Sequence, residues 1–441
     1  MRDEEGRAGS TLASRVCIRG GRVIDPLLGI DAVTDVVIAD GKIESVGACR
    51  EPALAQIDAT GKLVVPGLID LHAHVYWGLS SYGIDPDRAG VYSGVAHVND
   101  LGSVGWMTFA GFQKLIVRRA RTPLTCFPHM LSFGMTDNWG LGAPELANEK
   151  FYPELLAEHA AHHPDIIRGV KVFVERGFLS NLTETWKAFD AARRVTDLVP
   201  INLYVHLGDL FPMKPNTPLL DLESMLLEVV ERMRPGEVLG HCFTQFPGGF
   251  VNDEGKVSRA ARLATEKGLL HEVGHGLNFS FERARRFLAE GLPVDVISSD
   301  LHGTAHAGKP RPGFGLNSDT GAPNLNYSLM STMSKCLALG VPLLEVIRAA
   351  TLTPAKAIGL AAVKGSLTQG FAASISVLEL VPGRFRLLDS LGEVIRAEQL
   401  FLPVHTIVGN RIWRCDPFSL PEFQNDYVAN NPEAFGDVRR L

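Results

Sequence analysis

The sequence lacks a Cys-x-x-Cys pair, and its six cysteines lie far apart along the chain. We therefore expect free thiols, as is usual for a cytoplasmic protein. No uninterrupted apolar run reaches about 18 residues, the length that a membrane-spanning helix needs. Met1–Glu5 also lacks the apolar core of a signal peptide. The formal net charge is -6 and no long basic run occurs, which argues against nucleic acid or membrane surfaces as partners.

The chain does contain a regular alternation of short apolar runs and amphipathic segments after residue 64. Its 441 residues are 46% hydrophobic and 21% charged, which is ordinary for a large globular protein. The runs recur roughly every 25–40 residues, a spacing typical of βα units. Eight of them are expected to be strands, at 64–72, 95–100, 123–130, 166–174, 200–206, 237–242, 269–275 and 294–300. Eight such units predict an α/β fold of the (β/α)8 type, a TIM barrel.

Strand-type patterns return on both sides of this region. Residues 35–43 alternate apolar and polar around an Asp-Gly turn, which is a strong hairpin signal. Residues 364–379 form a turn-rich stretch followed by another strand pattern. We predict that residues 1–65 and 365–441 form a small β-sandwich domain beside a barrel domain of residues 66–364.

Polar side chains end several of the predicted barrel strands, where the carboxyl ends of all strands meet at one mouth. His72 and His74 end the first strand, and alternate side chains of a strand face the same side. The later strand ends carry Lys171, His206, His241 and Asp300. Taken singly, a histidine such as His206 or His241 is more often a core residue than a ligand. A single lysine is most often solvated or in a salt bridge, and Asp300 alone could cap a helix. Together they predict one shared metal centre, because six unpartnered polar groups at equivalent positions would be costly.

With these residues the chain resembles the amidohydrolase superfamily, in its binuclear subtype with a carboxylated lysine. The resemblance includes the run Pro66–His74, the strand-four lysine, the two later histidines and the aspartate. It extends to Gly365–Ile375, which is similar to the superfamily's Gly-x-Leu-x-x-Gly-x-x-Ala-Asp-Ile hairpin. Ser374 stands where aspartate is usual, a departure that concerns a turn of the sandwich and not the chemistry.

The resemblance implies a role for each residue of the centre. The two histidines of the first strand would hold one divalent ion together with Asp300, and His206 and His241 would hold the second. Zinc is the expected metal. Lys171, carboxylated by CO2, would bridge both ions, since a free ammonium has no lone pair for a metal. A hydroxide between the ions would attack the substrate, while Asp300 takes its proton as general base and delivers it to the leaving group.

Residues around the centre distinguish the branches of the superfamily. Dihydroorotases that resemble this architecture carry an arginine at the position of Tyr76, and adenosine-deaminase-like members have one metal and no such lysine. The runs Val273–Gly276, Ile297–His302 and Thr332–Gly340 resemble instead a group of deacetylase-like amidohydrolases. This resemblance implies a metal-dependent hydrolase that cleaves an amide or ester bond, N-acyl or O-acetyl, of a small molecule.

Alternatives to this function remain open at the level of sequence. A cyclic amidase that opens a lactam, imide or hydantoin-like ring would use the same metal chemistry, whereas a deaminase or a non-catalytic scaffold fits the intact ligand set less well. The substrate pocket is expected to include Tyr76, Trp77, His275 and His302, with packing at the barrel rim as the competing interpretation. We further expect a homo-oligomer.

Overall fold

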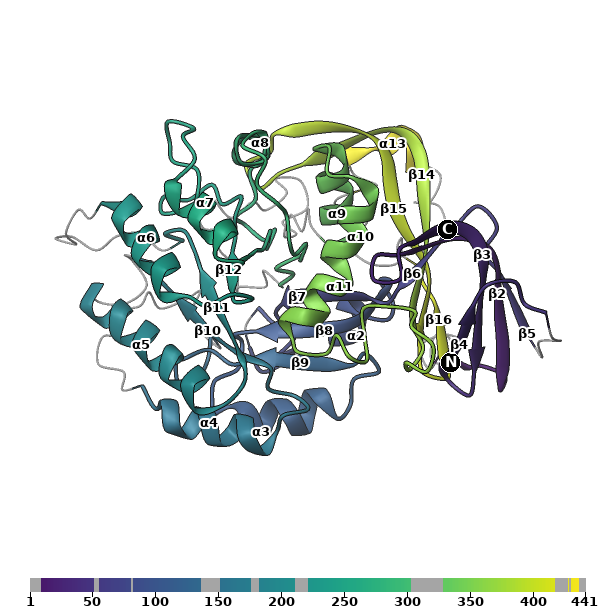
Figure 1. Ribbon diagram of the computed structural model, residues 1–441, viewed down its shortest axis with the longest axis horizontal. Helices are drawn as coiled ribbons and strands as arrows, with labels where there is room; N and C mark the ends of the chain where they lie inside the picture. The colour runs from purple at the N-terminus through teal and green to yellow at the C-terminus, as the bar shows by residue number, and fades with distance from the viewer. Residues whose placement is uncertain are drawn as a thin grey trace.

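The computed structural model describes residues 9–50, 55–80, 82–135, 151–175, 182–210, 221–302, 328–416, 427 and 430–435. Figure 1 shows two parts, a barrel on one side and a group of antiparallel strands on the other. The fold is therefore the predicted (β/α)8 barrel with a β-sandwich domain.

The barrel wall consists of a three-stranded and a four-stranded parallel sheet. Their strands are β7 (Leu68–Ala73), β8 (Val95–Leu101), β9 (Leu124–Phe127), β10 (Gly169–Phe173), β11 (Asn202–His206), β12 (Val238–Gly240) and β13 (Leu270–His271). Every residue of β7, β8, β9 and β10 is buried, as expected for strands that are covered on both faces.

Backbone pairs between these two sheets complete the ring. Between β9 and β10, the pairs are Cys126–Ile167 and His129–Lys171. On the other side, the pairs are Glu272–Val296 and Ala73–Leu301. The predicted eighth strand, 294–300, is thus an extended segment that closes the barrel without forming a regular strand. Asp300, whose φ is 50°, lies between the two paired residues Val296 and Leu301 and breaks the extended backbone there.

The described part of the chain forms helices, most of which surround the ring (Figure 1). They are α2 (Pro86–Ala89), α3 (Phe109–Phe112), α4 (Pro153–His162), α5 (Leu182–Leu198), α6 (Leu222–Arg232), α7 (Arg259–Glu266), α8 (Phe281–Ala289), α9 (Leu329–Ala338), α10 (Leu343–Ala350), α11 (Leu352–Ala357) and α13 (Pro432–Phe435), with a π-helical turn at Gln113–Val117. Side chains of Asp221, Ser258 and Ser280 cap α6, α7 and α8 by accepting from backbone N–H groups. Among the described helices, none has the length and apolar character that crossing a membrane requires.

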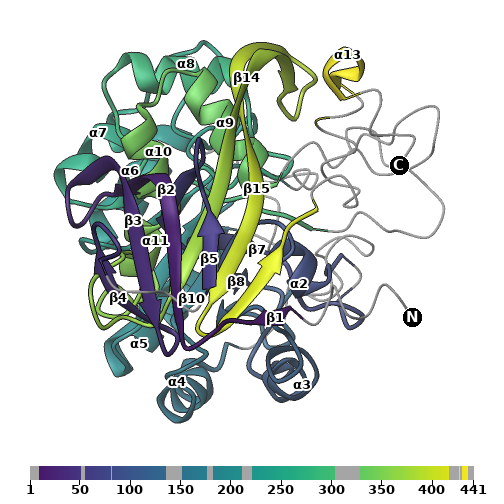
Figure 2. The same cartoon turned by 90° about the vertical axis from the view of Figure 1, so that its right-hand side faces the viewer.

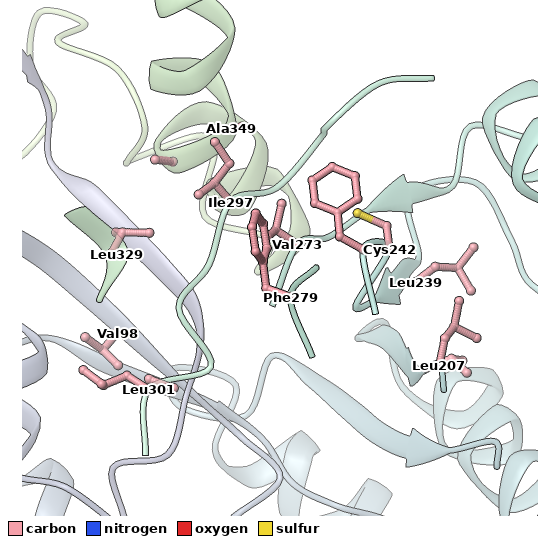
Figure 3. Close-up of a cluster of buried hydrophobic side chains, with 14 of the residues drawn as sticks. Val98, Leu207, Leu239, Cys242, Val273, Phe279, Ile297, Leu301, Leu329 and Ala349 are labelled. Carbon is pink, nitrogen blue, oxygen red and sulfur yellow. The ribbon is translucent and has the colours of Figure 1, made fainter. Parts of the chain in front are cut away.

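Apolar side chains fill the space between the barrel wall and its helices. Figure 3 shows part of this core, in which Val273 and Phe279 lie near Ile297 and Ala349. All four side chains are fully or almost fully buried. This packing fixes the segment 296–301 against α10, and so it positions Asp300 at the mouth.

The sandwich unites the two ends of the described chain in one path of hydrogen-bonded strands, ordered β1-β16-β15-β14-β6-β2-β3-β4, with β5 beside β2. The N-terminal strands are β1 (Ser10–Thr11), β2 (Arg15–Asp25), β3 (Ile30–Ala39), β4 (Lys42–Val46), β5 (Ala55–Asp58) and β6 (Leu63–Pro66). The C-terminal strands are β14 (Ser374–Leu388), β15 (Val394–Val408) and β16 (Arg411–Arg414). Both groups bury apolar residues in one core, among them Val16, Ile38, Ile375 and Ile407.

The predicted strand 64–72 is in fact two strands that belong to different parts of the fold. β6 pairs with β14 in the sandwich, whereas β7 starts the barrel. Gly67 separates them, and a Cβ there would lie 2.6 Å from the Cβ of Ala96. Ser376 of β14 ties the two parts together, because its hydroxyl accepts from Leu68 N at 3.0 Å and donates to Gly94 O at 2.6 Å.

The hairpin of β14 and β15 extends beyond the sandwich and over the barrel (Figures 1 and 2). There β15 packs on α9, and Phe401 N donates to the Ser334 hydroxyl at 3.0 Å. The domain limits of 1–65 with 365–441, and of 66–364, stay a prediction. Most of the C-terminal tail lies outside the described residues. No disulfide joins the six cysteines, all of which are described.

Candidate metal centre

The structure brings all six predicted ligands into one pocket at the mouth of the barrel. Five of them lie near or just beyond the carboxyl end of their strand or closing segment, where parallel strands converge, and Lys171 reaches the pocket from the middle of β10. All six side chains are buried. The pocket is lined by His72, His74, Lys171, His206, His241 and Asp300, and also by Met135, Phe173, Leu210, Leu277, Asn278 and His302.

His72, His74 and Asp300 form one group of possible ligands, and His72, His241 and Glu272 form a second. Oδ1 of Asp300 lies 3.2 Å from Nε2 of His72 and 3.1 Å from Nε2 of His74. These ligand atoms all lie within 4.8 Å of one another. Nδ1 of His74 lies 2.9 Å from the Ser103 hydroxyl, so that its Nε2 is left to face the carboxylate.

Lys171 reaches into the same pocket from β10. Its Nζ lies 3.4 Å from Nε2 of His72 and donates to Leu101 O at 3.1 Å. Gly102 leaves room for its side chain, since a Cβ there would lie 2.6 Å from Cδ of Lys171. Burial lowers the pKa of Lys171 to about 8, which makes the neutral amine accessible near physiological pH. A neutral amine is the form that can react with CO2.

His206 and His241 lie side by side at the other end of the pocket, with ring centroids 4.3 Å apart. Nδ1 of His241 donates to Gly274 O at 2.7 Å, which leaves Nε2 with a lone pair. Within the part of the chain that the structure describes, neither ring nitrogen of His206 makes a well-formed hydrogen bond, although the side chain is buried. Burial lowers the pKa of both histidines, to about 4 for His241, and both are therefore neutral. A neutral, buried imidazole with an unsatisfied nitrogen fits a metal ion, because such a nitrogen is costly without a partner.

Two of the candidate ligands have a left-handed backbone. His241 has a φ of 62° and Asp300 a φ of 50°, a region that residues with a side chain seldom adopt. Such a conformation costs energy of order 1–3 kcal/mol and is kept where the surrounding structure enforces it, often at functional sites.

Buried acidic residues behind the ligands were not anticipated from the sequence. Glu272 contacts His72 Nδ1 at 3.3 Å, and Asp70 accepts from the backbone of His72 and from Ser299. Burial raises the pKa of each of these two carboxyl groups to about 7. Their signal in the sequence is an acidic residue inside an otherwise apolar strand, a position that water does not reach.

The four residues expected to bind substrate lie in different places. His302 lines the pocket, and its Nδ1 donates to Asp300 O at 2.7 Å. Tyr76 is buried and its hydroxyl donates to Thr108 O at 2.9 Å. Trp77 is 55% exposed and lines a separate surface hollow. His275 is buried and stacks on Phe279, with ring centroids 4.5 Å apart. Only His302 of the four therefore lines the pocket that holds the predicted ligands.

Comparison with known proteins places the chain among metal-dependent hydrolases. The model of the amidohydrolase family matches residues 282–429, a segment that contains Asp300. Deacetylase Atu3266 of Agrobacterium fabrum is 30% identical over 383 residues, which cover 85% of this chain and 86% of that protein.

Two solved structures share the fold over most of the chain. A crystal structure of a dihydroorotase matches with a TM-score of 0.74 and 27% identity, over 91% of this chain and 99% of that chain. A crystal structure of an adenine deaminase matches with a TM-score of 0.75 and 24% identity, over 90% of this chain and 99% of that chain. The second likeness concerns the fold alone.

Proposed function

Because the chain belongs to the amidohydrolase family, we propose that it removes an acyl group from a small molecule. The substrate class is an N-acyl amide or an O-acetyl ester. The observation that carries the proposal is the convergence of four neutral histidines, Lys171 and Asp300 on one buried pocket. Similarity to a protein named as a deacetylase supports the choice of an acyl group.

The donor set fits two divalent ions, with zinc preferred for its affinity for imidazole and carboxylate ligands. The group of His72, His74 and Asp300 would hold one ion. His206 and His241 would hold the other, and a carbamate on Lys171 would supply an anionic oxygen to each. Ions bound there would activate a water molecule at neutral pH and polarise the substrate's carbonyl group.

Asp300 would move the proton in this reaction. Its carboxylate lies at the centre of the pocket, in contact with both histidines of the first strand. Burial raises the pKa of Asp300 above its ordinary value, which brings the group closer to the range in which it can both accept and return a proton. As general base it would take a proton from the attacking water, and as general acid it would give that proton to the leaving amine or alcohol.

The test is a hydrolysis screen of zinc-loaded protein with three matched libraries, of N-acyl amides, O-acyl esters and cyclic amides. The Asp300→Asn variant, prepared in the same way, controls for contaminating hydrolases. We expect turnover of acyl amides or esters by the wild-type chain that is lost in the variant. Turnover that persists in the variant, or no turnover of any acyl compound, would contradict the proposal.

A cyclic amidase is the second candidate, favoured by the similarity to the dihydroorotase structure. The position of Tyr76 argues against a dihydroorotase itself, because that residue offers no cation and turns its hydroxyl toward Thr108 O. In the same screen, ring opening of lactams, imides or hydantoins without turnover of linear acyl compounds would favour this second candidate.

A further inference from the structure

Glu272 lies directly behind the pocket, on the segment that follows β13, and its side chain is fully buried. No predicted role covers this residue. A buried carboxylate in a barrel wall needs partners, because an isolated charge in such a place is strongly disfavoured. The structure supplies these partners from four different parts of the barrel.

Each carboxylate oxygen of Glu272 accepts from two donors. Oε1 accepts from the Ser298 hydroxyl and faces Nδ1 of His72 at 3.3 Å. Oε2 accepts from the Tyr204 hydroxyl at 2.9 Å and from the backbone N–H of His241 at 3.1 Å. An ionised carboxylate has about four acceptor positions, so all are used.

This arrangement determines which nitrogen of His72 carries the proton. The Tyr204 hydroxyl gives its single proton to Glu272, so its oxygen, 3.1 Å from His72 Nδ1, can only accept from that nitrogen. Nδ1 of His72 therefore carries the hydrogen. Nε2 then has its lone pair directed into the pocket, where Asp300 Oδ1 lies at 3.2 Å.

Two glycines leave the space that these contacts occupy. At Gly240, an added Cβ would overlap with the Tyr204 hydroxyl. At Gly274, it would lie 2.6 Å from Oε2 of Glu272 and 2.8 Å from Nδ1 of His241. The network thus depends on close backbone approach from β12 and from the segment after β13.

We propose that Glu272, held by Tyr204 and Ser298, is a positioning residue that fixes the tautomer and ring orientation of His72 for metal binding, and that it also orients the backbone of His241. This inference rests on the proposed function, because it assumes a metal centre at His72. Glu272 lies close enough to His72 and His241 to be a third ligand. Because its two oxygens already accept from Ser298, Tyr204 and the backbone of His241, we assign it a positioning role and not a ligand role. Ligand histidines whose second nitrogen donates to a carboxylate bind metals more tightly than those without such a partner.

The test compares Glu272→Gln and Tyr204→Phe with the wild-type chain. The amide of glutamine has one acceptor oxygen and two N–H groups, so it cannot accept from four donors. The matched control is Thr125→Val, which removes buried hydrogen bonds to Asn99 and His97, none of them a candidate ligand. Zinc affinity is measured by chelator competition, zinc stoichiometry by metal analysis at saturation, and the free energy of unfolding by denaturant titration of the metal-free chains.

We expect Glu272→Gln to weaken zinc binding by about 10–100-fold while the saturated variant still binds as many ions as the wild-type chain. Tyr204→Phe should also weaken zinc binding, but by a smaller factor. Thr125→Val should leave the zinc affinity unchanged even if the variant is less stable.

Wild-type zinc affinity in Glu272→Gln would overturn the inference. If Glu272→Gln does not fold, wild-type zinc affinity in Tyr204→Phe would overturn it. Loss of one ion at saturation would also overturn it, because Glu272 would then be a ligand. A wild-type chain that binds no zinc would instead overturn the proposed function.

Discussion

The carboxylate of Asp300 packs against the backbone of Gly276, so closely that a methyl group on Gly276 would overlap with Oδ2. Gly276 has a φ of 37° and donates its N–H to Ser299 O at 2.9 Å. The position of the proposed general base is therefore fixed on one side by a residue without a side chain.

Gly276→Ala should displace Asp300 and lower kcat by about 10²-fold, the usual size of the effect when a reacting group is misplaced by an ångström. Gly359→Ala is the matched control, because Gly359 also has a positive φ, of 66°, but nothing within 4 Å of an added Cβ. The control should lose roughly 1–2 kcal/mol of stability from backbone strain alone and keep its kcat. Steady-state kinetics and denaturant titration of both variants separate the two effects. An unchanged kcat in Gly276→Ala would contradict the packing argument.

Asp300→Asn should nearly abolish turnover, with kcat reduced at least by about 10²–10⁴-fold. Asparagine keeps the shape and one ligand oxygen but cannot accept the proton. The kcat values of the variant and the wild-type chain are compared at matched zinc occupancy, so that a loss of metal does not contribute to the difference in rate. If Asp300 merely capped a helix, asparagine would serve equally well and the rate would fall by less than about tenfold.

Lys171→Ala should lose most of its metal and its activity, because the proposed bridge between the ions is removed. A short carboxylic acid such as acetate should restore part of both by supplying two oxygens in place of the carbamate. Lys187→Ala is the control, since Lys187 is an exposed residue of α5 whose one ion pair within the described residues is with Glu184. Full metal content and activity in Lys171→Ala would refute the bridging role.

Lys364→Met should change how stability depends on pH. Burial lowers the pKa of Lys364 from 10.5 to about 8 in the folded chain. Between these values the unfolded chain binds a proton that the folded chain does not, so wild-type stability falls as the pH falls from 10.5 to about 8. Below about pH 8 the penalty is constant.

The methionine variant has no such penalty, and its advantage over the wild-type chain should therefore grow as the pH falls through this window. Denaturant titrations of both chains at several pH values provide the measurement. A stability difference that does not vary between pH 8 and 10.5 would show that the Lys364 amine is not desolvated.

The barrel, and the meeting of the six candidate ligands in one pocket, could be predicted because both leave strong local patterns. Apolar runs of strand length determine where the wall lies, and a polar residue such as His206 stands out where such a run ends. The eighth strand was less regular than its sequence implied. Ser298 and Ser299 place their hydroxyls on buried carboxylates, and this long-range pairing leaves no periodic signal.

The sequence does not reveal residues, such as Glu272, whose proposed role is to hold a ligand side chain in position. The role of Glu272 becomes visible only in the folded barrel, because its partners come from β11, β12, β7 and the segment 294–300. Trp77 follows the histidine pair directly along the chain, but its side chain lies in a surface hollow elsewhere, and its role in substrate binding stays a prediction. Beyond the end of a strand the alternation of side chains stops, so closeness to the histidine pair along the chain does not predict whether a side chain faces the pocket or the surface.

The pairing of β6 with β14 has a consequence for synthesis of the chain. Val65 lies opposite Ser376, so more than three hundred residues must be made between the two partners. Until the ribosome has released the C-terminal hairpin, one edge of the N-terminal strands has no neighbour and is open to pairing with other chains. Nascent chains are therefore most exposed to aggregation late in translation, when the barrel sequence is complete but its sandwich is not.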